Sequence, residues 1–152
     1  MTITEELKPE QQDLYRGIYR EINYKIIRHA KGREHTPANE GIWCFYIYLH
    51  ESKVKDFSKL WLPVKIVKFS LESRGYVNYE YYCEPFNSME FHGGITYYCK
   101  YGETEGYRSV EIGCDYNHLW DNERGCGYDV EDILVGVKCA IDSVYEIGLI
   151  KE

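Results

Sequence analysis

The segment IWCFYIYL, residues 42–49, is the clearest strand in the sequence and sets how the rest of the chain is interpreted. Successive side chains of a strand point to opposite sides of its sheet. One face would carry Trp43, Phe45, Ile47 and Leu49. The residues between them are also apolar or aromatic, so both faces can be covered. This pattern predicts a central strand with a neighbour on each side.

Four more strands are predicted downstream from alternating apolar residues and from the turn residues that separate them. They cover residues 64–69, 76–83, 91–100 and 107–114. The last two are joined by a short loop that begins at Gly102 and ends at Gly106, which indicates an antiparallel hairpin. In such a hairpin, residue 92 is expected roughly opposite residues 114–117.

A helix is predicted at each end of the chain. Residues 130–147 carry a continuous apolar stripe, and Asp129 and Asp132 have the spacing of a capping box. Between about residues 9 and 30, apolar side chains recur every four positions, which also suits a helix. These positions are Leu14, Ile18, Ile22 and Ile26.

The predicted fold class is α+β, a mainly antiparallel sheet of about four to five strands with an N-terminal and a C-terminal helix. The 152 residues are expected to form a single domain, 1–152. Within it, residues 1–40 would be an N-terminal helical segment and residues 41–152 the sheet with its C-terminal helix.

The composition predicts a soluble protein of the cytoplasm. No apolar run approaches 18 residues, and the first eight residues, MTITEELK, lack the features of a signal peptide. We therefore expect no membrane contact. The six cysteines form no CxxC pair, and in a reducing compartment we expect them to be free thiols.

The negative charge is concentrated in the second half of the chain. The net charge is −7, and residues 69–152 alone hold sixteen acidic and six basic residues. Such a surface repels nucleic acid, so direct nucleic-acid binding is not expected. These acidic residues either keep the protein soluble or form an acidic face that binds a basic partner. The 16 tyrosines suit partly wet strands and also binding surfaces.

One candidate site lies in the string FHGGITY, residues 91–97. Paired glycines weaken a strand, and they mark either a bulge or a place where something approaches the backbone closely. The candidate residues here are His92, Gly93, Gly94 and Thr96. The alternative is a bulge beside a histidine of the core.

The second candidate cluster is GCDYNHLWD, residues 113–121, in which Asp115, His118 and Asp121 are spaced three apart. On one or two helical turns these side chains would share a face. Together with His92 they would form a set for a divalent metal or for acid–base chemistry. The alternative is a capped turn. The P-loop, GxSxG and HExxH signatures are absent, and the sequence assigns no catalytic residue, metal or cofactor.

The strings HGGITYY, residues 92–98, and IGCDYNHLWD, residues 112–121, resemble a family of small uncharacterised phage-encoded proteins. That family carries an HGG(L/I)T(Y/F) motif followed by a GxDxxHxxD motif. The resemblance covers about the last two thirds of the chain. It implies a phage-type accessory protein that works in the host bacterial cytoplasm, and it implies no reaction.

Three functional hypotheses follow. The first is a non-enzymatic antagonist of host defence, whose partner is a host defence protein or a nucleotide signal. The second is a small hydrolase or nucleotide-processing enzyme that uses His92 with the turn from Asp115 to Asp121. The third is a structural or assembly protein, and the sequence leaves open whether several copies form a homo-oligomer. Convergence of His92 and His118 in one pocket would favour a ligand or chemistry, whereas their separation would favour a surface partner.

Overall fold

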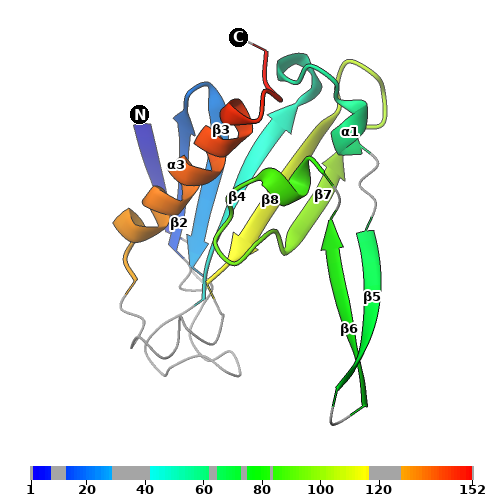
Figure 1. The fold of residues 1–152 in the computed structure, drawn as a ribbon. Coiled ribbons are helices and arrows are strands. Elements are labelled where there is room, and N and C mark those ends of the chain that lie inside the picture. Colours follow the sequence, from blue (N-terminus) through cyan, green and yellow to red (C-terminus); the bar gives the residue numbers. More distant parts are fainter. Residues whose placement is uncertain are drawn as a thin grey trace.

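The fold is built mainly from antiparallel strands (Figure 1). The computed structural model describes residues 2–7, 13–28, 42–61, 65–72, 75–82, 84–116 and 128–151. A six-stranded sheet has the order β1-β2-β3-β4-β8-β7, and β5 with β6 forms a separate two-stranded ribbon. The strands of the six-stranded sheet are β1 (Thr2–Leu7), β2 (Asp13–Tyr19), β3 (Ile22–Arg28), β4 (Trp43–His50), β7 (Tyr97–Tyr101) and β8 (Ser109–Asp115). The two-stranded ribbon consists of β5 (Lys65–Glu72) and β6 (Gly75–Tyr82).

The helical elements are few. They are α1 (Ser58–Trp61), α3 (Val130–Glu146) and the 3-10 turns η1 (Glu51–Lys53) and η2 (Phe86–Ser88). In the part of the chain that the structure describes, no helix is long and apolar enough to cross a bilayer.

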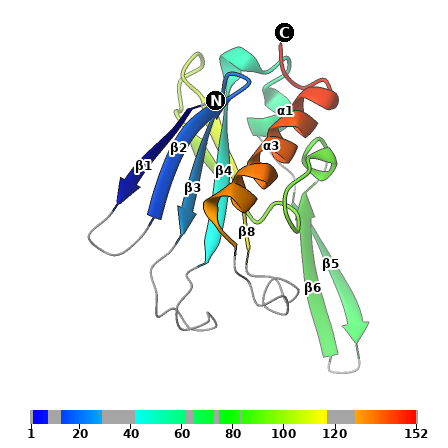
Figure 2. The same cartoon turned by 90° about the vertical axis from the view of Figure 1, so that its left-hand side faces the viewer.

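The long helix α3 covers one face of the six-stranded sheet (Figure 2). It packs against β3 and β4, and the turn η2 lies on the same side. Ile133, Val137 and Ile141 are fully buried in this layer, which confirms that the C-terminal helix packs on the sheet. Among the described elements, none covers the opposite face of the sheet, which we call the open face.

The predicted central strand is confirmed. β4 pairs with β3 on one side and with β8 on the other. Phe45, Ile47 and Leu49 of β4 are fully buried beneath α3, whereas Tyr46 and Tyr48 lie on the open face and are half-buried.

The predicted N-terminal helix is wrong. Over residues 13–28 the chain forms the hairpin of β2 and β3, joined by a two-residue turn at Arg20 and Glu21. Both turn residues have positive φ angles, 48° and 66°, as in the type I′ turns that join two strands closely. A spacing of four residues fits a strand as well as a helix, because four is a multiple of the strand period of two. The contact of Arg20 with Asp142 of α3, at 2.9 Å, holds the turn in place.

The C-terminal helix has the predicted ends. The side chain of Asp129 accepts a hydrogen bond from the backbone N–H of Asp132, and the side chain of Asp132 accepts one from Asp129, both at 3.0 Å. Two donors that the first helical turn leaves open are thereby satisfied. After α3 the chain leaves the helix through Gly148, whose φ is +76°.

The fourth predicted strand is shorter than expected, because β7 begins at Tyr97 and not at residue 91. Residues 91–94 instead form a turn in which the N–H of Gly94 donates to the carbonyl of Phe91 at 2.9 Å. Gly93 and Gly94 have φ angles of +68° and +89°, which glycine adopts without strain. These angles are incompatible with the extended backbone predicted for residues 91–96. The hairpin of β7 and β8 is confirmed and pairs Tyr98 with Ile112.

Four cysteines lie within the described residues, and all four are free thiols, as predicted: Cys44, Cys99, Cys114 and Cys139. Cys83 and Cys126 lie outside the described residues. The coarse prediction of an antiparallel α+β fold with a C-terminal helix is therefore correct, with more strands than expected because the N-terminal segment joins the sheet.

Candidate functional site

His92 lies on the helix-covered side of the sheet. Its ring stacks on the ring of Tyr116, with 3.9 Å between centroids and 9° between planes. The preceding residue, Phe91, is buried and stacks on Phe45 of β4 at 5.5 Å. The glycine turn therefore anchors one aromatic side chain in the core and presents the next at its edge.

Asp115 does not join His92. Cys114 and Tyr116 both belong to the core beneath α3, so strand alternation places the intervening Asp115 on the open face. There its carboxylate accepts a hydrogen bond from Thr96 Oγ1 at 3.2 Å. Of the residues predicted to form one site, the structure thus brings together Thr96 with Asp115, and it separates both from His92.

The remaining members of the predicted set, His118 and Asp121, lie outside the described residues. Within the residues that are described, no group of three or more histidine, cysteine or acidic side chains could hold a metal ion. Gly93 and Gly94 are exposed and act through the turn geometry given above.

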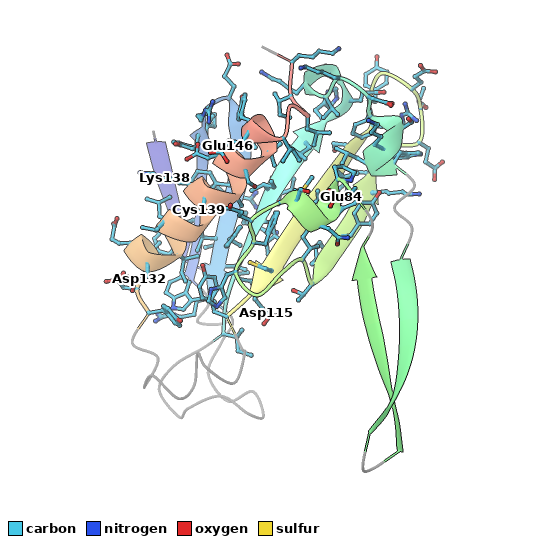
Figure 3. All side chains as sticks on the ribbon, in the orientation of Figure 1. Glu84, Asp115, Asp132, Lys138, Cys139 and Glu146 are labelled. Atoms are coloured by element: carbon cyan, nitrogen blue, oxygen red, sulfur yellow. The ribbon has the colours of Figure 1, made fainter. Side chains whose placement is uncertain are left out.

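A surface groove of about 500 Å³ lies where His92 emerges, between α3 and the loop that precedes β7; we call it the His92 groove. Figure 3 shows two of its residues, Asp132 and Cys139, on α3, while Asp115 lies at the end of β8. The main side chains that line it are Glu90, His92, Tyr116, Tyr128, Asp132 and Cys139.

Aromatic rings form the floor of the His92 groove. Tyr116 lies between His92 and Phe45, and Tyr128 meets Tyr116 edge-on with 5.1 Å between centroids. The indole N–H of Trp43 donates to the backbone carbonyl of Tyr128 at 3.1 Å, so Tyr128 is fixed to the start of β4. The rings are therefore held in place by the sheet.

A glycine of α3 makes room for this floor. A Cβ at Gly136 would overlap the phenol oxygen of Tyr116 and would lie 3.2 Å from Phe45 Cε2. Glycine in the middle of a helix costs about 1 kcal/mol relative to alanine, so its presence here is explained by this close approach.

Ser143 fixes the loop wall of the groove. Its hydroxyl accepts a hydrogen bond from the backbone N–H of Glu90 at 2.9 Å and donates one to the carbonyl of Ala140 at 2.7 Å. Ser143 is buried, with 3% of its surface exposed, so neither bond competes with bulk water.

The charged lining of the His92 groove is acidic. Glu90 and Asp132 are exposed carboxylates on the loop wall and the helix wall. Among the described residues that line the groove there is no lysine and no arginine. The groove therefore combines flat aromatic surfaces with two negative charges.

A different polar cluster occupies the open face, centred on Glu111 of β8. This glutamate is only 3% exposed; its carboxylate accepts a hydrogen bond from Tyr101 at 3.0 Å and lies 3.6 Å from Lys25 Nζ. Burial alone would raise its pKa, but hydrogen bonding from tyrosines such as Tyr48 and the charge of Lys25 outweigh burial and lower the pKa. The ammonium of Lys25 also lies over the ring of Tyr46, 4.9 Å from its centroid. These partners neutralise and enclose the carboxylate, which makes the cluster a stabilising element of the sheet.

Comparison with protein-family models, curated proteins and solved structures found no match to this chain. The resemblance of its two motifs to a phage-encoded family stays a prediction.

The sequence did not point to several residues that shape the groove. Tyr128 and Glu90 stand outside any motif, and contacts with residues distant in the sequence fix their backbones: Trp43 holds the carbonyl of Tyr128, and Ser143 holds the N–H of Glu90. Gly136 carried a readable signal, since an interior glycine in an otherwise strong helix indicates a close approach by another group.

Proposed function

We propose that this protein acts by binding a host protein, as a phage-type accessory protein that antagonises host defence in the bacterial cytoplasm. Within the part of the chain that the structure describes, one observation favours binding over catalysis. The ring of His92 is packed on Tyr116 in an aromatic groove, while Asp115 faces the other side of the sheet. A histidine and a carboxylate must lie within hydrogen-bond reach to act together on a proton.

The charge of the groove supports a protein partner over a nucleotide signal. A nucleotide brings phosphate groups, which would have to lie beside Glu90 and Asp132 without a lysine or arginine among the described lining residues. The negative charges of these two carboxylates would repel the phosphate groups. A basic protein surface, by contrast, is attracted by the acidic second half of the chain.

A phage-restriction assay tests the proposal. The chain is expressed in bacteria that carry individual defence systems, and the plating efficiency of a restricted phage is measured. We expect the wild-type chain to raise plating against at least one system, and Glu90→Lys to reduce this protection. Glu103→Lys reverses a charge in the exposed loop between β7 and β8, outside the groove, and should protect as well as the wild type.

The enzymatic alternative makes an opposite prediction. The purified chain is incubated with nucleotides and phosphodiester substrates, and products are followed by chromatography. We expect no turnover. Turnover that His92→Ala abolishes without lowering the melting temperature would overturn the proposal in favour of a hydrolase.

A further inference from the structure

We infer that a patch of lysines beside the C-terminal end of α3 binds an acidic segment of a protein partner. The patch consists of Lys53, Lys55, Lys59 and Lys151, and we call it the lysine patch. Figure 1 shows the turn after β4, the helix α1 and the C-terminus at one end of the molecule. This surface is opposite in charge to the His92 groove and is not part of the proposed function.

A short antiparallel bridge brings two of these lysines together. Val54 pairs with Ile150, and both side chains are buried. The backbone N–H of Lys151 donates to the carbonyl of Lys53 at 2.8 Å, which places these two lysines directly opposite each other. Lys55 follows on the other side of Val54. Neighbouring residues of an extended chain point to opposite sides, so the lysines that flank the buried pair project away from the core.

The bridge places like charges together with little compensation. Like charges directly opposite each other on paired strands destabilise the pairing. Lys53 Nζ lies 3.5 Å from Glu21 Oε2, but the side chain of this glutamate is 81% exposed, so the ion pair contributes little. Among the described residues, no ion pair is formed by Lys55, Lys59 or Lys151. Proteins break local rules of this kind mainly at functional sites, and bound carboxylates would supply the missing negative charge.

A pocket of about 530 Å³ opens beside the lysine patch. Lys55 and Lys59 line it together with two apolar residues from the end of α3, of which Leu149 is buried and Ile147 is 36% exposed. An apolar side chain next to the partner's carboxylates can therefore be covered here, and its removal from water would add to the affinity.

The charges around the lysine patch favour a protein segment over nucleic acid. Asp56 and Glu84 line the same pocket, and each accepts a hydrogen bond at 2.5 Å from a serine hydroxyl, Asp56 from Ser58 and Glu84 from Ser88. A nucleic acid carries a phosphate at every nucleotide, so it would meet these carboxylates as well as the net charge of −7. A protein segment can place carboxylates at the lysines and neutral residues elsewhere.

The test is a titration of the isotope-labelled full chain, followed by nuclear magnetic resonance. The probe is the blocked peptide acetyl-Glu-Glu-Leu-Glu-amide. One matched peptide has glutamine in place of each glutamate, a second has serine in place of leucine, and a thymidine tetranucleotide represents nucleic acid. We expect the probe to shift the amide resonances of Lys53, Leu149 and Lys151. Both matched peptides should bind more weakly, the glutamine peptide at least several-fold, and the affinity of the probe should fall as salt is raised.

Variants separate the lysine patch from the net charge of the protein. Lys151→Gln should weaken binding of the probe by about two- to five-fold, the size expected for one exposed charge pair. It should not lower the melting temperature, because it removes a like charge opposite Lys53. Lys138→Gln, on α3 and outside the patch (Figure 3), makes the same change in net charge and should leave the affinity unchanged.

Four results would overturn the inference. The first is an equal loss of affinity in Lys138→Gln and Lys151→Gln, which would assign binding to net charge alone. The second is a set of equal shifts from the glutamate and glutamine peptides. The third is a tetranucleotide that shifts the same resonances at lower concentration. The fourth is a Lys151→Gln variant that melts at a lower temperature and still binds the probe as tightly as the wild type, since that lysine would then be structural.

Discussion

Replacing Gly136 by Ala should destabilise the protein, although the same change stabilises an ordinary helix. Alanine is favoured over glycine in a helix interior by about 1 kcal/mol. Here the added methyl group would overlap the phenol oxygen of Tyr116, which stacks on His92 and therefore has little room to move aside. Overpacking of this kind costs about 1–3 kcal/mol. Subtracting the gain in helix propensity leaves an expected net loss of up to about 2 kcal/mol, measured by urea denaturation followed by circular dichroism.

The reasoning identifies a single atom, so a second substitution tests it directly. Tyr116→Phe removes the phenol oxygen, after which the nearest atoms to the new methyl group would be Phe45 Cε2 at 3.2 Å and Cζ of residue 116 at 3.6 Å. In that background, Gly136→Ala should be neutral or stabilising by up to about 1 kcal/mol. The double-mutant cycle should therefore give a coupling energy of about 1–3 kcal/mol.

Val135→Ala provides a control for helix propensity, since Val135 lies beside Gly136 on α3 and is 62% exposed. It should raise stability slightly, because alanine is the better helix former. Two results would refute the reasoning. One is a Gly136→Ala variant that is more stable than the wild type, and the other is a coupling energy below about 0.5 kcal/mol, the lower end for residues in contact.

Two further perturbations test the core and the open face. Ile141→Ala, at a fully buried position, should cost about 2–5 kcal/mol in chemical denaturation, while Ile18→Ala, at a position 52% exposed, should cost less than about 1 kcal/mol; equal losses would contradict the packing of α3. Because the pKa of Glu111 is lowered in the folded chain, its ionised form adds stability above the pKa it has when unfolded, and this stability disappears as the pH falls through its lower folded pKa. Glu111→Gln should therefore lower stability at pH 7 and flatten its decline in acid; a decline as steep as in the wild type would exclude this role.

The accuracy of the sequence-based predictions depended on how much of the signal was local. The capping box at Asp129 and Asp132 and the apolar stripe that follows are contained within one element, and both were predicted correctly. The segment from Leu14 to Ile26 was misread because its spacing fits two periods. In the structure, contacts with residues distant in the sequence favour the strands over a helix. Ile26 pairs with Phe45 of β4, and Arg20 in the turn donates a hydrogen bond to Asp142 of α3.

The glycine pair at 93 and 94, in the candidate site, is a second local pattern that fits two different structures. The sequence correctly indicated a local break in extended structure, but a bulge and a turn have the same glycine signature. The positive φ angles at both residues close a turn back onto Phe91. That turn moves His92 out of the strand and brings it against Tyr116.

Among the described residues, the side chain that His92 meets is decided by which side of β8 each residue faces. Residues 114–117 were expected near His92, and a residue of this segment does lie there. Strand alternation sends the side chains of Cys114 and Tyr116 toward α3 and that of Asp115 away from it. The histidine therefore meets a phenol ring where a one-residue shift of register would have supplied a carboxylate. The same proximity to β8 thus yields a stack of aromatic rings, and the exposed carboxylates of Glu90 and Asp132 lie on either side of the groove.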